Sequence, residues 1–178
     1  IPAHHGDALI RALFAAGGDL GVTPYGTETM SVLRIEKGHA AGGEFNGQTT
    51  AHDLGFAKLL APDKDYIGKI LAQRAALTDP ARPRLVGIRP AQEGMKIAGG
   101  AHLVTPDVAP DAAADQGFVT ASAFSPHLNS YIGLALIKNG PDRIGEKLRY
   151  YDPVRGVDAL AEICAPVFID PKGERQRG

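Results

Sequence analysis

Cysteine, net charge and long apolar runs are all scarce in this sequence of 178 residues. The single cysteine, Cys164, excludes an internal disulfide and is compatible with a reducing compartment, so we expect a cytoplasmic protein. Lys and Arg number 19 and Asp and Glu number 20, which gives a formal net charge of -1. Such a balance provides no field to attract nucleic acid. No apolar run approaches the roughly 18 residues of a membrane span, so we expect no membrane contact.

Glycine and proline, by contrast, are abundant, with 22 and 13 residues respectively. An average globular chain carries about 7% Gly and 5% Pro, so this excess indicates many turns and argues against an all-helical architecture. The apolar fraction of 44% and the charged fraction of 22% are typical of a folded chain rather than a disordered one.

Three segments in the first 80 residues show the apolar spacing of amphipathic helices. We expect these helices over residues 5–16, 23–38 and 66–76. In the second, Thr23 is the expected N-cap and Pro24 the first helical residue, where the missing N–H of proline costs nothing. A glycine-rich loop over residues 38–47 follows, and then a short helical turn that Thr49 or Thr50 caps.

After Asp79-Pro80 the helical spacing ends and short β-type runs begin. Turn signals separate these runs, which are residues 85–88, 102–105, 118–122, 131–137, 148–151 and 160–169. Several short strands of this kind predict a small sandwich or barrel. The sequence therefore indicates an α+β chain with a helix-rich part over residues 1–80 and a β-rich part over residues 81–178.

The sequence contains no motif of a self-contained catalytic or metal site. Its six histidines lack HExxH spacing, and Asp107, Asp111 and Asp115 lack the closing Glu of an EF-hand, which favours a solvated loop. Cys164 lies in an apolar run without a basic neighbour, which indicates a buried structural thiol rather than a nucleophile. GxSxG, GxGxxG and P-loop patterns are also missing. We therefore expect neither a catalytic residue nor a metal ligand.

One local pattern points to a binding role. In LRIEKG, residues 33–38, Arg34 and Glu36 are two apart, and residues with this separation do not face each other on a helix. Arg34 lies one step from the apolar stripe of Met30 and Leu33, at the margin of the core. Its forked donors suit a planar polar ring or a carboxylate. Alternatively, Arg34 ties the helix end to a neighbouring carboxylate or carbonyl.

The segment TPYGTETMSVLRIEKG, residues 23–38, resembles the tetrahydrofolate-binding aminomethyltransferase family. Further motifs match in order across nearly the whole chain, namely DYIGK at 65–69, GFVT at 117–120, SP at 125–126, IGLAL at 132–136 and FIDP at 168–171. Within this family, YGTE ahead of LRxEKG and the ending GERQRG at 173–178 look most like the C-terminal part of the α subunits of heterotetrameric sarcosine oxidases. Glycine-cleavage members usually read RLEAG where this sequence reads RIEKG.

The resemblance implies a fold and an activity. The fold is a partial ferredoxin-like, helix-rich α+β layer in residues 1–80, followed by a small six-stranded antiparallel β-barrel in residues 81–178. The implied activity is oxidation of sarcosine at a flavin and transfer of the imine carbon to tetrahydrofolate held in this domain. Glycine, hydrogen peroxide and methylenetetrahydrofolate are the implied products, and formaldehyde is released without folate. The domain's own part is to position the pterin ring.

The resemblance also implies that four residues belong to the folate site. Arg34 matches the family arginine beside the pterin. Glu36 is expected to orient Arg34 or a neighbouring backbone group rather than to touch the ligand. Tyr25 is expected to flank the ring or to lie in the core. Ser125, followed by Pro126, matches a loop between barrel strands and is expected to shape the cavity edge or to form a tight turn.

Part of the family's site has no counterpart in this sequence. The acidic residue nearest the reaction centre and the glutamate that pairs with the pterin lie, in the family, ahead of the position of Ile1. The sequence also begins without an initiator Met or a signal peptide, so we expect a piece of a longer protein, inactive on its own. FAD, FMN and NAD are implied for the parent complex and not for this chain alone. The implied partners are the rest of the α subunit and the other subunits.

Two other functions fit the same residues. One is a fragment of a glycine-cleavage-type aminomethyltransferase or of a dimethylglycine-oxidising enzyme. The other, of a different class, is a non-catalytic barrel module that binds only protein partners. A dinucleotide-binding fingerprint far upstream in the full-length gene product would indicate the sarcosine oxidase subunit, and folate titration would identify the non-catalytic module.

Overall fold

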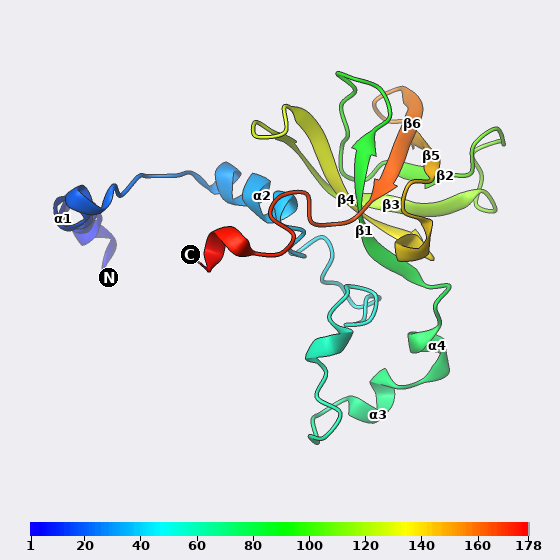
Figure 1. The fold of residues 1–178 in the computed structure, drawn as a ribbon, viewed down its shortest axis with the longest axis horizontal. Helices are drawn as coiled ribbons and strands as arrows, with labels where there is room; N and C mark the ends of the chain where they lie inside the picture. Colours follow the sequence, from blue (N-terminus) through cyan, green and yellow to red (C-terminus); the bar gives the residue numbers. More distant parts are fainter. Residues whose placement is uncertain (178) are drawn as a thin grey trace. The chain divides into compact units, whose positions relative to one another are not determined.

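Helices and loops make up residues 1–82, and strands begin at Pro83 (Figure 1). The computed structural model describes residues 1–177 apart from the side chain of Gln176, and Gly178, the last residue of the expected barrel part, lies outside the described residues. The α-helices are α1 (Gly6–Gly17), α2 (Thr27–Glu36), α3 (Lys69–Ala72) and α4 (Ala75–Thr78). Short 3-10 helices span Ala3–His5, Gly18–Leu20, Ala57–Leu59, Gly140–Arg143 and Glu174–Gln176. The chain forms two compact units, one of residues 1–30 and one that begins at Ser31.

The first unit is built around α1, where the sequence predicts a helix. It contains no buried residue, and its larger apolar side chains are exposed. On α1 these exposed side chains are Leu9, Ile10, Leu13 and Phe14. None of the helices in residues 1–177 has the length and hydropathy of a membrane span.

The beginning of α2 differs from the prediction. The helix begins at Thr27 rather than at Pro24, and Thr23 does not cap it. The Thr23 hydroxyl donates instead to the carbonyl oxygen of Gly21, at 3.2 Å. The Met30 N–H donates to the carbonyl oxygen of Gly26 at 3.4 Å, so the helical hydrogen bonds begin three residues later than the proline pattern suggests.

The end of α2 is fixed by Gly38. Its φ of +70° is left-handed, and the N–H groups of Gly38 and His39 donate to the carbonyl oxygens of Ile35 and Arg34 at 3.0 and 2.8 Å. This is a Schellman C-cap, which glycine adopts without steric cost. A Cβ at Gly38 would lie 2.5 Å from the Pro166 carbonyl oxygen. The helix end and the C-terminal segment therefore touch at a point that only glycine permits.

The predicted third helix, residues 66–76, is wrong as a continuous element. Two short helices, α3 and α4, stand in its place. Gly68 has a left-handed φ of +89°, so α3 starts only after it, and Arg74 is extended with ψ of 138°. Most apolar side chains of this segment are exposed, so tertiary packing does not stabilise one longer helix here.

Six antiparallel strands close into a barrel in the order β1-β4-β3-β2-β5-β6. They are β1 (Pro83–Pro90), β2 (His102–Val104), β3 (Asp115–Ser125), β4 (Ser130–Lys138), β5 (Lys147–Asp152) and β6 (Val157–Cys164). The α+β class and the six-stranded antiparallel barrel are confirmed, and all six β-type runs contribute a strand. Of the ferredoxin-like layer that we expect in residues 1–80, the structure contains the helices. The division into residues 1–80 and 81–178 stays a prediction.

The last strand ends earlier than predicted, at Cys164 instead of residue 169. Pro166 has no N–H to donate to a neighbouring strand. The chain turns away there and reaches the end of α2, where the N–H groups of Phe168 and Ile169 donate to the Glu36 carbonyl oxygen at 2.9 and 3.1 Å. Lys37 adds a contact to the Asp170 carbonyl oxygen at 2.5 Å.

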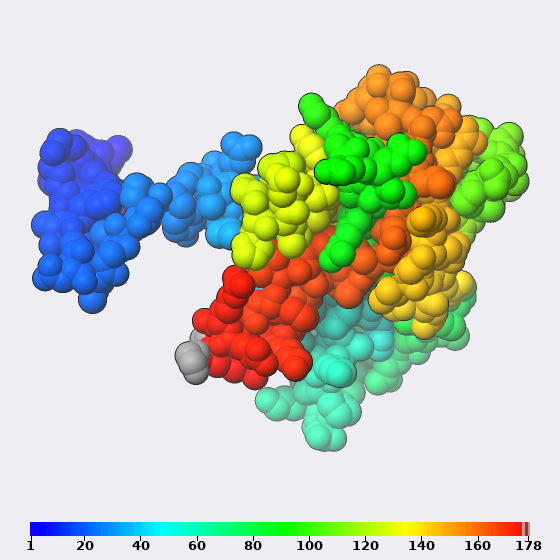
Figure 2. Space-filling view, turned by 45° about the horizontal axis from the view of Figure 1, so that its top comes forward, coloured from blue at the N-terminus to red at the C-terminus, as the bar shows by residue number. Residues whose placement is uncertain are grey.

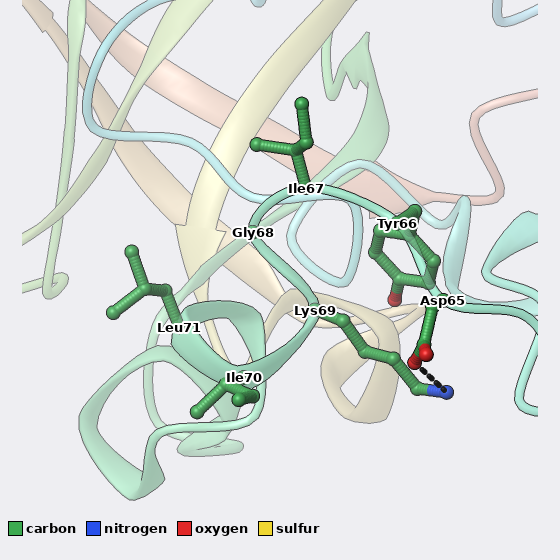
Figure 3. A pocket seen from close by; sticks show the side chains of 7 residues that line it. All are labelled: Asp65, Tyr66, Ile67, Gly68, Lys69, Ile70 and Leu71. Atoms are coloured by element: carbon green, nitrogen blue, oxygen red, sulfur yellow. Dashed lines mark ion pairs between the residues drawn. The ribbon is translucent and has the colours of Figure 1, made fainter.

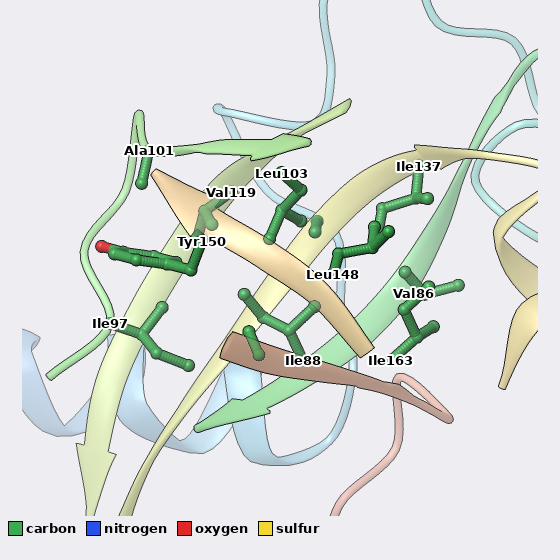
Figure 4. Close-up of a cluster of buried hydrophobic side chains, with 12 residues drawn as sticks. Val86, Ile88, Ile97, Ala101, Leu103, Val119, Ile137, Leu148, Tyr150 and Ile163 are labelled. Atoms are coloured by element: carbon green, nitrogen blue, oxygen red, sulfur yellow. The ribbon is translucent and has the colours of Figure 1, made fainter. Parts of the chain in front are cut away.

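Buried side chains fill the barrel interior (Figure 4). They are Val86, Ile88, Ile97, Ala101, Leu103, Val119, Ala135, Ile137, Leu148, Tyr150, Ala161 and Ile163. The one polar atom of Tyr150 in this core is satisfied, because the Ala98 N–H donates to its hydroxyl oxygen at 2.9 Å.

A second apolar cluster lies on the outside of the barrel, where α2 and the C-terminal segment pack. It consists of Ile35, Leu54, Leu85, Ala121, Ile132, Leu134, Leu136 and Phe168. In Figure 2 the C-terminal segment, in red, lies against the barrel. We call this contact the α2–barrel interface, formed by residues 34–56, the outer face of the strands and residues 166–170.

Asp53 attaches the loop of this interface to the first strand. Asp53 and Thr50 cap each other, with the Thr50 N–H donating to the carboxylate at 2.9 Å and the Asp53 N–H to the Thr50 hydroxyl at 3.2 Å. The Arg82 guanidinium donates to the same carboxylate at 2.7 and 3.0 Å. Burial raises the pKa of Asp53, but the hydrogen bonds from Arg82 and Thr50 outweigh it and hold that pKa below its ordinary value.

We expect Gly117→Ala to destabilise the barrel. Gly117 has a φ of +147° and pairs with both Leu103 and Ile137, and a Cβ there would collide with the Leu136 carbonyl oxygen. The free energy of unfolding, measured by urea denaturation, should fall by about 3 kcal/mol. Gly42→Ala, at a position with open space around the Cβ, is the control and should change it by less than about 0.5 kcal/mol. An equal effect of both substitutions would contradict the strain at Gly117.

Asp53→Asn should lower the free energy of unfolding at pH 7 by about 3 kcal/mol, because it leaves Arg82 without its buried partner. A carboxyl whose folded pKa is depressed stabilises the protein above its ordinary pKa of 3.8 and loses this effect as the pH falls through the folded value. The difference between wild type and variant should therefore shrink below about pH 4. Urea denaturation at pH 7 and pH 3 measures it, with exposed Asp63→Asn as the control; a difference independent of pH would refute this assignment.

Candidate functional site

Arg34 lies in the last turn of α2, with its side chain 24% exposed. Its Nη1 donates to Oε2 of Glu44 at 2.9 Å and to the His39 carbonyl oxygen at 3.3 Å. Both of these bonds use Nη1, and Nε and Nη2 of Arg34 form no hydrogen bond to the part of the chain that the structure describes. Nη1 alone therefore ties the helix end to a carboxylate and a carbonyl, as the alternative interpretation of Arg34 expects. The other two nitrogens remain able to bind a further group.

Glu44 is the centre of this arrangement and is completely buried. Its Oε2 also accepts a hydrogen bond from the Ala41 N–H at 2.7 Å, and its Oε1 accepts one from the Thr120 hydroxyl at 2.5 Å. Thr120 belongs to β3, so the carboxylate joins the loop, the helix end and the barrel wall. Glu44 is not among the site residues predicted from the sequence. The available signal was that it is the one acidic residue in the glycine-rich loop after α2.

Glu36 and Ser125 form a second buried polar pair. The Ser125 hydroxyl, at 0% exposure, donates to Oε1 of Glu36 at 2.5 Å and accepts a hydrogen bond from the Leu128 N–H at 3.2 Å. No hydrogen bond in the described chain joins Glu36 to Arg34. The structure thus brings Glu36 together with Ser125, and Arg34 together with Glu44. The pair connects the last turn of α2 to the turn between β3 and β4.

Tyr25 belongs to the first compact unit and precedes α2. Its side chain is not in a core, because the residue is 68% exposed. Arg34, Glu36 and Ser125 all lie in the second unit.

Cys164 differs in one respect from the prediction. It has a basic neighbour on β1, because the guanidinium of Arg89 favours the thiolate and acts to lower the pKa of the thiol. Burial nevertheless dominates and raises the pKa of the thiol to about 11, so the thiolate is scarce at neutral pH. The interpretation of Cys164 as a structural thiol stays a prediction.

The aspartates of the loop after β2 serve local structure. Asp111 accepts hydrogen bonds from the N–H groups of Ala113 and Ala114, both at 2.9 Å, and Asp115 lies 3.2 Å from Nδ1 of His102. Among residues 1–177 no group of three or more His, Cys, Asp and Glu side chains is arranged to hold a metal ion.

A hollow at residues 65–71, which contain the DYIGK motif, is open and mostly apolar (Figure 3). Ile67 and Ile70 are exposed. The one amine, Nζ of Lys69, donates to the carbonyl oxygens of Pro62 and Lys64, both at 2.8 Å, and lies 3.9 Å from Oδ1 of Asp65. The lysine is therefore used to fold its own loop.

Two family models match this chain. The GCVT N-terminal domain matches residues 1–64, and the glycine cleavage T-protein C-terminal barrel domain matches residues 84–170. A crystal structure of the glycine cleavage system aminomethyltransferase T from Bartonella henselae has the same fold, with a TM-score of 0.75 and 20% sequence identity. It is matched over 96% of this chain and 45% of its own.

Curated relatives fall into two groups. The sarcosine oxidase subunit alpha of Rhizobium meliloti (strain 1021) is 44% identical over 98% of this chain, and that of Corynebacterium sp. (strain U-96) is 40% identical over 100%. This chain spans only 18% of each of these two proteins. The aminomethyltransferase of Anoxybacillus flavithermus (strain DSM 21510 / WK1) is 32% identical over 93% of this chain and 44% of its own length.

Both domain families occur here in succession, and the relatives match nearly every residue of the chain. The sequence identity to the two sarcosine oxidase subunits, 44% and 40%, is higher than the 32% identity to the aminomethyltransferase. The chain therefore belongs to the glycine cleavage T-protein family, and within it the chain is similar to sarcosine oxidase α subunits.

Proposed function

We propose that this chain contributes part of the tetrahydrofolate site of a sarcosine oxidase α subunit. One observation carries the proposal: buried Glu44 holds Nη1 of Arg34 at 2.9 Å, while Nε and Nη2 have no partner in the part of the chain that the structure describes. These two nitrogens share one edge of the guanidinium and form a pair of parallel donors. The carbonyl oxygen of a pterin ring is an acceptor that these donors can bind.

In the proposed reaction, sarcosine is oxidised at a flavin elsewhere in the parent complex, and oxygen is reduced to hydrogen peroxide. The imine carbon then passes to tetrahydrofolate, which gives methylenetetrahydrofolate and glycine; without folate the carbon leaves as formaldehyde. FAD, FMN and NAD belong to the parent complex in this proposal and not to this chain. The contribution of Arg34 is to orient the ring so that its amine meets the iminium carbon.

The other predicted site residues take supporting roles in the proposal. Glu36 and Ser125 are buried against each other, so we assign them to the shape of the cavity edge and not to direct contact with the ring. Tyr25 is exposed and can flank a planar ligand. In this proposal the acidic residue nearest the reacting carbon and the glutamate that pairs with the pterin come from another part of the parent. We therefore expect the isolated chain not to oxidise sarcosine.

The proposed partners are the rest of the α subunit and the other sarcosine oxidase subunits. The support is that the chain matches sarcosine oxidase α subunits over nearly all of its residues while spanning 18% of their length. The single Cys164 is compatible with the cytoplasmic location that we propose.

A glycine-cleavage-type aminomethyltransferase is a second candidate, because both matching domain families are named after the glycine cleavage T-protein. The two candidates share the folate and differ in the donor of the carbon. Hydrogen peroxide released from sarcosine by the parent complex would decide for sarcosine oxidase. No peroxide, together with folate binding, would decide for the aminomethyltransferase.

Arg34→Ala in the full-length parent enzyme should raise the Kd for tetrahydrofolate by about 10- to 100-fold, the effect of losing a charged hydrogen bond. Arg34→Lys should recover only part of the affinity, because lysine keeps the charge but not the paired donors. Isothermal titration of the parent with tetrahydrofolate measures both. Arg11→Ala is the control, since the side chain of Arg11 is 76% exposed and pairs with Asp7 on α1. An unchanged Kd in Arg34→Ala would overturn the assignment of Arg34.

A further inference from the structure

We propose that Glu44 is a positioning residue of this site, which turns Arg34 so that its Nε and Nη2 edge faces the ligand. The inference rests on the proposed function, because it concerns the arginine that binds the pterin. It adds a residue that lies ten positions further along the chain, in the glycine-rich loop. Through Thr120 it also makes the wall of the barrel part of the folate site.

The burial of Glu44 is the first observation. A carboxylate with no exposed surface is expensive unless each oxygen is paired. Here three donors meet it, Nη1 of Arg34 at 2.9 Å, the Ala41 N–H at 2.7 Å and the Thr120 hydroxyl at 2.5 Å. A buried polar group that is satisfied in this way has one preferred orientation, and so does the arginine attached to it.

The two oxygens of Glu44 have different partners, and this fixes the plane of the carboxylate. Oε2 binds Arg34 and the loop backbone, whereas Oε1 binds Thr120 on β3. The preceding residue, Gly43, brings the loop close to the same strand, because a Cβ there would lie 3.2 Å from the Thr120 carbonyl oxygen. Glu44 is thus held by a rigid strand and in turn holds a flexible side chain.

The consequence for Arg34 is that both of its intramolecular bonds use one nitrogen. Nη1 contacts Glu44 and the His39 carbonyl oxygen, and the opposite edge carries no bond in the described part of the chain. A free arginine side chain loses rotamer entropy when it is ordered. Since Glu44 already orders it, less of that loss falls on ligand binding.

The test uses the full-length parent enzyme, the variants Glu44→Gln, Arg34→Ala and their combination, and isothermal titration with tetrahydrofolate. Glu44→Gln keeps the size of the side chain but removes the charge that holds Arg34. We expect its Kd to rise about tenfold, in line with the loss of one charged hydrogen bond. In the double variant the Kd should equal that of Arg34→Ala, because Glu44 acts only through Arg34.

Asp53→Asn is the matched control. It also removes a buried carboxylate paired with an arginine in the same interface, but its partner is Arg82 and not Arg34. It should lower the thermal midpoint and leave the Kd for tetrahydrofolate unchanged. A general loss of packing in this region would instead raise the Kd of both carboxylate variants.

Thr120→Val gives a second route if Glu44→Gln does not fold. It removes the hydroxyl that donates to Oε1 and keeps the shape of the side chain. We expect a rise of about threefold in Kd that disappears in the Arg34→Ala background. If Glu44→Gln does not fold, the Kd of Thr120→Val decides whether Glu44 positions Arg34.

Each outcome decides the proposal. If Arg34→Ala weakens binding and Glu44→Gln does not, the positioning role is overturned while the proposed function stands. The same conclusion follows if the two effects multiply in the double variant. If Arg34→Ala itself leaves the Kd unchanged, the folate role of Arg34 is overturned, and the positioning role with it.

Discussion

The site depends on one close contact, in which the end of α2 at Gly38 touches the C-terminal segment at Pro166. At this point the helix stops, the chain after β6 arrives, and the backbone of Glu36 accepts two N–H groups from Phe168 and Ile169. The outer apolar cluster then fills the space between helix and barrel. Glu36 and Glu44 are each buried at this interface, and each finds a hydroxyl on β3. Because their donors are fixed, this polar interface permits one register of helix against barrel, whereas an apolar contact alone tolerates sliding.

Much of the barrel could be predicted from the sequence, and the reason is local. Short runs rich in branched apolar residues, separated by Gly, Pro and Asn, identify strands without knowledge of their partners. The boundaries that the sequence missed depend on single conformations. Gly68 is left-handed and delays α3, Thr23 bonds backward to Gly21 while α2 begins only at Thr27, and Pro166 follows the end of β6. Intrinsic propensity alone does not set these helix and strand boundaries, because tertiary contacts or a single φ angle override it.

The candidate site was less predictable than the fold, because its contacts join distant positions. Arg34 was identified from the motif, but its partner Glu44 has no pattern around it, and Thr120 lies 76 positions beyond Glu44. The same holds for Ser125, which meets Glu36 across 89 positions. The local pattern thus indicated that a guanidinium sits at the core margin, and only the closed barrel shows which of its nitrogens is engaged. Arg89 beside Cys164 was missed for a similar reason, since the two lie on different strands.

The closed order of the six strands also limits how other proteins can associate with this domain. A sheet with a free edge can take up a strand from a partner through backbone hydrogen bonds. In the barrel described here each strand has a neighbour on both sides, so no edge is offered for that kind of pairing. Association with another protein would then use side chains, loops and helix faces, whose chemistry varies with sequence. Partner choice in this fold is therefore open to change by substitution at the surface while the strand pairing remains intact.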